Sequence, residues 1–185
     1  MIQIKNAAEL QKMRKACAIS AAALKAGGEA IEPGITTAEI DKIIYDFIVR
    51  HGARPNFLHL YGFPATACIS VNDTVIHGIP SKQQQIRPGD IVSIDTGCKI
   101  DGFNGDNACT YGCGKLDLEA QRLLDVTKES LHRGIEMARG GNRVGDIGHA
   151  VQTYVEENGF SVVRTFVGHG VGKELHEDPE VPNFG

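Results

Sequence analysis

The fold of this chain is decided by residues 24–52, which read LKAGGEAIEPGITTAEIDKIIYDFIVRHG, because their pattern returns at residues 131–159, LHRGIEMARGGNRVGDIGHAVQTYVEENG. At an offset of 107 positions the matched pairs are Leu24 with Leu131, Glu29 with Glu136, Gly34 with Gly141, Ile40 with Ile147, Ile44 with Val151, Phe47 with Tyr154, Ile48 with Val155 and Gly52 with Gly159. An internal repeat of this kind indicates two copies of one structural unit. We expect a single domain whose copies span about 8–114 and 115–185.

Each copy begins with a pattern typical of two helices. In the first copy, residues 7–30 are rich in alanine and carry apolar residues along one side, and Pro33-Gly34 ends this helix. Thr36-Thr37-Ala38-Glu39 has the form of a capping box, which predicts a second helix through about Val49. The helices expected for the second copy lie at about 117–138 and 143–157.

Short strand-like runs follow the first helix pair. They lie at Ala65–Val71, Asp90–Thr96 and about Lys99–Thr110, and turn residues separate them. A further strand is predicted at Ser161–Val167, leading into a glycine-rich loop at 168–172. The order of helix pair, strands, helix pair and strand predicts an α+β fold.

Composition limits the function classes. The 185 residues are 42% hydrophobic and 23% charged, which is typical of a globular domain. A net charge of −4 favours neither nucleic acid nor an anionic membrane as partner. We also expect no transmembrane segment and no secretory signal. Five cysteines, an odd number, favour a reducing compartment, so we expect a cytoplasmic protein.

Two aspartates carry the clearest chemical signal. Asp95 ends an apolar strand whose alternation places Val92 and Ile94 on the opposite face. Asp106 follows eleven residues later in the next strand, so the two carboxylates are neighbours if residues 99–102 form a hairpin turn. Neighbouring buried carboxylates repel unless a cation separates them, which predicts a metal site. In the alternative interpretation one aspartate caps a turn and the other lies on a solvated edge.

Two histidines extend this pattern. His169 lies between glycines after an apolar run, and two carboxylates with one imidazole suit Mn, Fe, Co or Zn. His77 follows an apolar stretch and precedes Gly-Ile-Pro, where an imidazole can hold a substrate carbonyl. Taken singly, a histidine between glycines such as His169 is more often a turn residue, and His77 alone is a weak signal. The sequence has no serine-hydrolase elbow, phosphate loop, dinucleotide fingerprint or zinc helix, so metal-assisted hydrolysis is the best reaction class.

Four segments, in this order and spacing, carry a resemblance to a known family. They are Cys68-Ile-Ser-Val-Asn-Asp-Thr-Val-Ile-His77-Gly-Ile-Pro80, Asp90-Ile-Val-Ser-Ile-Asp95, Asp101-Gly-Phe-Asn-Gly-Asp106, and Gly168-His169-Gly-Val-Gly172 with His176-Glu177. From about Ile4 to Gly185 the chain resembles the type I methionine aminopeptidases of the pita-bread fold. The resemblance implies removal of the initiator methionine by a centre of two divalent ions, Co, Mn, Fe or Zn.

The resemblance also implies roles for individual residues. The matching positions make Asp95, Asp106 and His169 metal ligands, with Asp106 bridging both ions. His77 and His176 match residues that contact the substrate and stabilise the tetrahedral intermediate. The positions that line the methionine pocket are matched by Phe63 and Cys68. The implied partners are nascent chains that begin with Met, and the ribosome, without direct nucleic-acid or membrane binding.

The chain departs from the family pattern at its end. Family members have five protein ligands, and the last two are glutamates in the second half. In the second copy of the repeat, the counterparts of Asp95 and Asp106 would fall near positions 202 and 213, so we expect a C-terminally truncated form with little or no activity. An incomplete sheet also favours self-association. The alternatives are an Xaa-Pro peptidase relative and a non-catalytic binding protein.

Overall fold

The computed structural model describes all 185 residues, which form two compact units. The unit that we call the N-terminal unit contains Ile4–Leu116 and Val171–Leu175. The C-terminal unit contains Met1–Gln3, Asp117–Gly170 and His176–Gly185. Each unit combines helices with antiparallel strands, and the predicted α+β class is confirmed.

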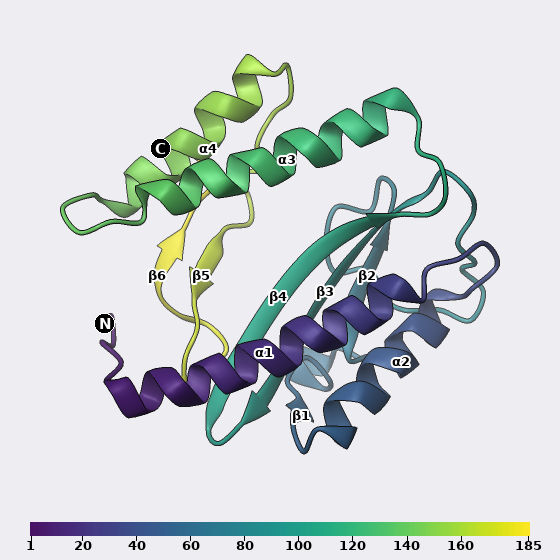
Figure 1. Ribbon diagram of the computed structural model, residues 1–185, viewed down its shortest axis with the longest axis horizontal. Helices are drawn as coiled ribbons and strands as arrows, with labels where there is room; N and C mark the ends of the chain where they lie inside the picture. Colours follow the sequence, from purple (N-terminus) through teal and green to yellow (C-terminus); the bar gives the residue numbers. More distant parts are fainter. The chain divides into compact units, whose positions relative to one another are not determined.

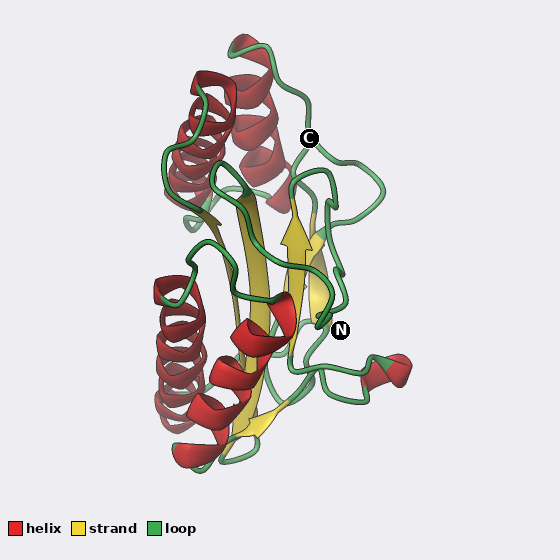
Figure 2. Cartoon of the chain, turned by 90° about the vertical axis from the view of Figure 1, so that its right-hand side faces the viewer, coloured by secondary structure: helices red, strands yellow, loops and turns green.

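The N-terminal unit is a four-stranded antiparallel sheet with two helices on one face (Figures 1 and 2). Its elements are α1 (Ala7–Glu29), α2 (Thr37–Arg50), β1 (Arg54–Pro55), the short 3-10 helix η1 (Leu60–Gly62), β2 (Ala67–Val71), β3 (Ile91–Ile100) and β4 (Phe103–Gly112). Strand β3 is central, because β4 pairs with one edge and β1 and β2 share the other. The long β3–β4 hairpin therefore forms the frame of this unit.

Both helices of the N-terminal unit begin at a capping box. The Asn6 side chain accepts a hydrogen bond from the Glu9 backbone at 3.0 Å, and the Glu9 carboxylate accepts one from the Asn6 backbone. Thr36 and Glu39 make the same reciprocal pair at the start of α2, as predicted. Each pair satisfies backbone N–H groups that have no acceptor within the helix.

Strand β3 divides its residues between two faces. Val92, Ile94 and Cys98 are fully buried on the face toward α1 and α2, where they join the main hydrophobic core. The α2 residues of this core are Ile40, Ile44 and Ile48. Asp95 lies on the opposite face, because successive strand residues alternate. The apolar core thus fixes which way the polar residues of β3 point.

The C-terminal unit consists of α3 (Leu118–Met137), α4 (Val144–Glu157), β5 (Gly168–Gly170) and β6 (Glu177–Val181). The two helices pack together, and β5 pairs antiparallel with β6. None of the helices of either unit combines the length and the apolar character needed to cross a membrane.

In the helix pair of each unit, a glycine of the first helix contacts a branched side chain of the second, at equivalent positions of the repeat. A Cβ on Gly27 would lie 2.7 Å from Ile44 Cδ1, and a Cβ on Gly134 would lie 2.8 Å from Val151 Cγ2. These residues correspond at the repeat offset of 107, which matches Gly27 with Gly134 and Ile44 with Val151. In both copies, therefore, a glycine lets a branched side chain of the second helix approach the first.

The predicted strand at Ser161–Val167 is wrong. Those residues have no strand structure, and the strand β5 begins only at Gly168, inside the segment predicted as a loop. An apolar run becomes a strand only where a second backbone supplies hydrogen bonds. Here the partner β6 meets Gly168–Gly170, and a Cβ on Gly170 would lie 2.5 Å from the carbonyl oxygen of Asp178.

Gly105 provides a test of the packing between β4 and α1. A Cβ at this position would lie 2.5 Å from the backbone of Ala16 and Cys17, which cannot move without shifting the helix. We expect Gly105→Ala to lower the free energy of unfolding by about 1–3 kcal/mol, measured by urea denaturation. The matched control is Gly145→Ala, because nothing lies within 4 Å of a Cβ there. Equal effects of the two substitutions would contradict this account of the packing.

Candidate metal centre

The register of the β3–β4 hairpin places the two aspartates on one face. Asp95 pairs with Ala108, and Asp106 pairs with Gly97. Asp106 is two residues from Ala108 on the same strand, so its side chain points to the same side as that of Asp95. The two residues are thus diagonal neighbours across the hairpin, within reach of each other's side chains.

The nearby Asp106 carboxylate affects the pKa of Asp95. Burial, and then the charge and side-chain hydrogen bond of Asp106, raise the pKa of Asp95 from an ordinary 3.8 to about 7. A carboxyl group with such a pKa shares its surroundings with another negative charge and little water. A divalent cation would offset both effects, because it favours the charged form of each carboxylate. The donor set therefore fits a hard or borderline metal ion.

Asn56 adds an unpaired acceptor to the same face. A Cβ on Gly97 would lie 2.5 Å from Asn56 Oδ1, so this amide covers the sheet where Gly97 pairs with Asp106. Asn56 Oδ1 is buried and has no hydrogen-bond partner. Buried polar atoms nearly always have a partner, so an unpaired acceptor beside two carboxylates is typical of a site that receives a ligand.

An apolar cluster adjoins the carboxylates. Cys68 on β2 pairs directly with Asp95 on β3, so the two side chains share a face. Burial, followed by the charges of Asp95 and Asp106, raises the pKa of the Cys68 thiol to about 12. The thiol is therefore neutral and behaves as a small apolar side chain. The buried members of the cluster are Phe57, Cys68 and Leu175, and Leu60 and Phe63 pack against them.

His77 lies on a loop that is fastened to the edge of β2. The backbone N–H of Gly78 donates to Ser70 Oγ at 3.0 Å, and the N–H of Ile69 donates to the Gly78 carbonyl at 2.9 Å. A Cβ on Gly78 would lie 2.2 Å from that backbone, so only glycine fits. His77 itself is exposed and has a φ of 57°, which is uncommon outside glycine.

His169 and His176 are neighbours within the C-terminal unit. Their ring centroids lie 4.4 Å apart at an interplanar angle of 66°, an edge-to-face arrangement. His169 Nδ1 is 2.9 Å from the carbonyl oxygen of Gly170. A carbonyl can only accept, so Nδ1 carries the proton and, in the neutral ring, Nε2 is the nitrogen suited to a metal.

The structure thus groups the predicted residues in two sets. Asp95, Asp106, Cys68 and Phe63 share one face of the N-terminal sheet, and the loop with His77 borders β2. His169 and His176 form the second set, in the C-terminal unit.

Sequence reasoning missed four residues on the carboxylate face. Alternation along β4 could have found Asn104, because it lies two residues before Asp106 in the predicted strand. Asn56, Phe57 and Leu175 carry no such signal, because segments distant in sequence bring them to this face.

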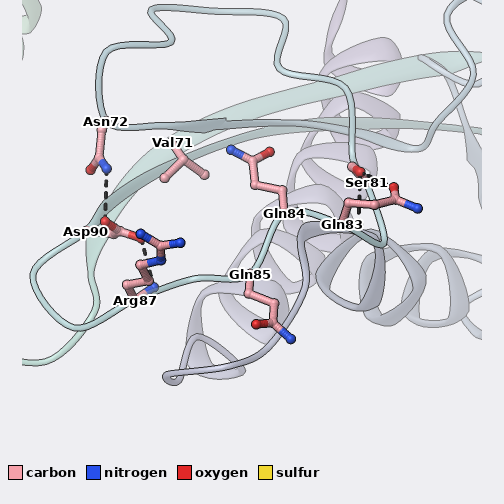
Figure 3. A pocket seen from close by; sticks show the side chains of 8 residues that line it. All are labelled: Val71, Asn72, Ser81, Gln83, Gln84, Gln85, Arg87 and Asp90. Carbon is pink, nitrogen blue, oxygen red and sulfur yellow. Dashed lines mark hydrogen bonds between the residues drawn. The ribbon is translucent and has the colours of Figure 1, made fainter.

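A separate hollow in the N-terminal unit has a volume of about 510 Å³. Its lining, shown in Figure 3, is Val71, Asn72, Ser81, Gln83, Gln84, Gln85, Arg87 and Asp90. Asp90 is its one carboxylate, and that group accepts hydrogen bonds from the Asn72 side chain and the Arg87 backbone. A single carboxylate engaged in this way does not form a metal site.

Comparison with known proteins agrees with this geometry. The sequence matches the profile of Metallopeptidase family M24 over residues 11–185. It is 54% identical over 185 residues to a methionine aminopeptidase of Clostridium perfringens, covering 100% of this chain and 74% of that relative. It is 46% identical to methionine aminopeptidase 1 of Bacillus subtilis, with the same shares of the two chains covered.

The fold of this chain is also similar to those of solved structures. The crystal structure of methionine aminopeptidase from Thermotoga maritima has a TM-score of 0.98 at 42% identity, covering 100% of this chain and 74% of that chain. The prolidase from Pyrococcus furiosus has a TM-score of 0.84 at 24% identity, covering 98% and 52%, which shows a shared fold alone.

The chain therefore belongs to metallopeptidase family M24, and its fold is the pita-bread fold that the resemblance implied. The relatives with 40–54% identity are methionine aminopeptidases. Membership of a metallopeptidase family implies divalent metal in the site, in agreement with the paired aspartates.

The raised pKa of Asp95 predicts a pH-dependent stability of the metal-free protein. Because the folded state binds this proton more tightly than the unfolded state, stability falls as the pH rises from about 4 to about 7. We expect Asp95→Asn to raise the Tm of metal-free protein at pH 8 by about 2–8 °C, and to change it little at pH 4. Scanning calorimetry measures both values.

The control for this experiment is Asp73→Asn, because Asp73 is an exposed carboxylate outside the hairpin. We expect the same Tm difference at both pH values for this variant. A stabilisation by Asp95→Asn at pH 4 as large as that at pH 8 would show that repulsion between the two carboxylates is not the cause.

Proposed function

We propose that this protein is a metal-dependent aminopeptidase that removes an N-terminal methionine from polypeptides. The observation that carries the proposal is the pair Asp95 and Asp106 on one sheet face, beside the apolar cluster of Cys68. Charged ligands and an apolar cluster side by side suit a substrate with a free amine and a thioether side chain. The names of the 40–54% identical relatives point to the same activity.

We propose Asp95, Asp106 and His169 as ligands of two divalent ions chosen among Co, Mn, Fe and Zn. When bound, such ions would lower the pKa of a coordinated water and so supply a nucleophile near neutral pH. Asp95 and Asp106 would be fully ionised in that state, because cations reverse the effect of their mutual repulsion. The tautomer of His169 supports its role, since its Nδ1 proton is engaged by the Gly170 carbonyl.

The cluster formed by Phe57, Leu60, Phe63, Cys68 and Leu175 is the proposed methionine pocket. Its walls are aromatic, aliphatic and thiol groups, and the thiol is held neutral at physiological pH by burial. An unbranched thioether makes favourable contacts with aromatic rings and polarizable sulfur. A branched or charged side chain would lose these contacts or bring an unpaired charge into the cluster.

His77 and His176 are proposed to contact the substrate carbonyl during the reaction. His77 is exposed on a fastened loop, so its imidazole can meet a substrate without rearrangement of the sheet. His176 is held edge-to-face against His169. An imidazole at each position would donate a hydrogen bond to the developing oxyanion.

The alternative activities have less support. An Xaa-Pro peptidase would agree with the shared fold, but the prolidases and aminopeptidases P among the solved neighbours are only 22–24% identical. A non-catalytic binding protein would not require the paired carboxylates or the raised pKa of Asp95. The ribosome as a partner, self-association and a cytoplasmic location stay predictions from the sequence.

The proposed activity predicts methionine release from Met-Ala-Ser by metal-free protein reloaded with Mn(II) or Co(II), measured by amino-acid analysis. We expect Asp106→Asn and His169→Ala to abolish release, because each removes a ligand. Ala-Pro-Ala should not be cleaved. Cleavage of Ala-Pro-Ala in preference to Met-Ala-Ser would establish the Xaa-Pro alternative instead.

Metal binding can be measured apart from turnover. By isothermal titration calorimetry, we expect Asp106→Asn to weaken Mn(II) binding, whereas Asp101→Asn, an exposed carboxylate paired with Lys15, should not. Tight binding that persists in Asp106→Asn would contradict the ligand assignment.

A further inference from the structure

Asn104 is the most deeply buried amide side chain of the N-terminal unit, with only 2% of its surface exposed. It lies on β4, two residues before Asp106, so both side chains belong to the same face of the hairpin. A buried amide requires partners for two N–H donors and one carbonyl acceptor. The hydrogen-bond partners of Asn104 therefore show which part of the chain this residue holds in place.

All the donors of Asn104 are directed at one short segment. Its side-chain amide donates to the Gly172 carbonyl at 3.0 Å and to the Lys173 carbonyl at 3.0 Å. Its backbone N–H also donates to the Gly172 carbonyl, at 2.8 Å. The side-chain oxygen accepts from the Asn56 amide at 3.3 Å, which fixes the orientation of the group.

Two further contacts hold the same segment. The Lys99 ammonium donates to the Lys173 carbonyl at 2.6 Å, and Leu175 is buried against Phe57 and Cys68. Residues 171–175 are thus fastened to the outer edge of β4 at one end and to the apolar cluster at the other. Neither attachment comes from regular strand pairing, so the segment depends on these side chains for its position.

The segment is short, and a proposed functional histidine lies close to each of its ends in the sequence. His169 precedes Val171 by two residues, and His176 directly follows Leu175. A backbone fixed at Gly172 and Lys173 restricts the conformations open to residues so near in the chain. Loss of the attachment would free several backbone dihedrals and so increase the conformational freedom of these residues.

We propose that Asn104 is a positioning residue for the proposed aminopeptidase reaction. It holds segment 171–175 against the strand that carries Asp106 and thereby restricts the backbone of His169 and His176, which adjoin this segment in the sequence. The inference rests on the proposed function for its catalytic consequence only. The attachment itself exists in the metal-free protein and is measurable there.

The main experiment compares Asn104→Asp and Asn104→Ala with the unmodified protein. Asn104→Asp keeps the shape but replaces both N–H donors by oxygen, which repels the two carbonyls. In metal-free protein, we expect faster amide hydrogen exchange confined to residues 170–176 and altered ¹⁵N shifts of the His169 and His176 rings. We expect Mn(II) affinity and kcat on Met-Ala-Ser to fall about 10–100-fold, with KM changed less.

Lys99→Met serves as the matched milder variant, because Lys99 is a half-exposed residue that supplies one hydrogen bond to the same carbonyl. We expect it to increase exchange in the same segment by a smaller factor and to leave the fold intact. In the double variant with Asn104→Ala, the effects on Mn(II) affinity should not be additive, since both groups act through one carbonyl. This variant keeps the test decisive if Asn104→Asp fails to fold.

The outcomes separate this inference from the proposed function. Faster exchange in 170–176 and weaker Mn(II) binding, without methionine release by any form, would support the positioning role and reject the aminopeptidase. Methionine release that is unaffected by a folded Asn104→Asp, with unchanged exchange in this segment, would overturn the positioning role alone. Exchange that rises uniformly over the whole N-terminal unit would also overturn it, because a merely structural role predicts that result.

Discussion

The repulsion between Asp95 and Asp106 is the constraint on which the site depends. The two carboxylates lie on adjacent strands, β3 and β4, which pair over ten residues. The apolar residues of β3 are buried in the core on the opposite face, so the strand cannot rotate to move Asp95 away from Asp106. Burial, and then the charge of Asp106, raise the pKa of Asp95. A sheet optimised for stability alone would not keep such a pair, which supports the proposal that a cation provides the compensating interaction.

The sheet separates two kinds of chemistry by strand alternation. On one face, branched aliphatic residues of β2 and β3 pack against α1 and α2 and provide rigidity. On the other face, carboxylates, amides and a small apolar cluster lie within a few residues of one another. Because one register fixes both faces, a slip of a single residue would bury Asp95 in the core and expose Ile94. The hydrophobic core therefore specifies the site indirectly.

Local signals predicted the helices well and the last strand badly. Capping residues and apolar periodicity act within a few positions, so the helices at 7–29, 37–50, 118–137 and 144–157 differ from the predicted bounds by one or two residues. The hairpin of Asp95 and Asp106 was also predicted, but its turn was placed at residues 99–102. In the structure Ile100 pairs with Phe103, so the turn is at residues 101–102 and the two aspartates are diagonal neighbours. Ser161–Val167 looked like a strand, but no backbone pairs with it, and that information is not local.

The sequence by itself determined the repeat, the helix pairs, the face of β3 that carries Asp95, and the motifs that relate the chain to its family. These features follow from short-range rules of periodicity, capping and spacing. Only the tertiary structure decided that Leu175 and Phe57 join Cys68, and that Asn104 fastens segment 171–175. Such contacts join residues that are well separated in the sequence, so the short-range rules of periodicity and capping do not predict them.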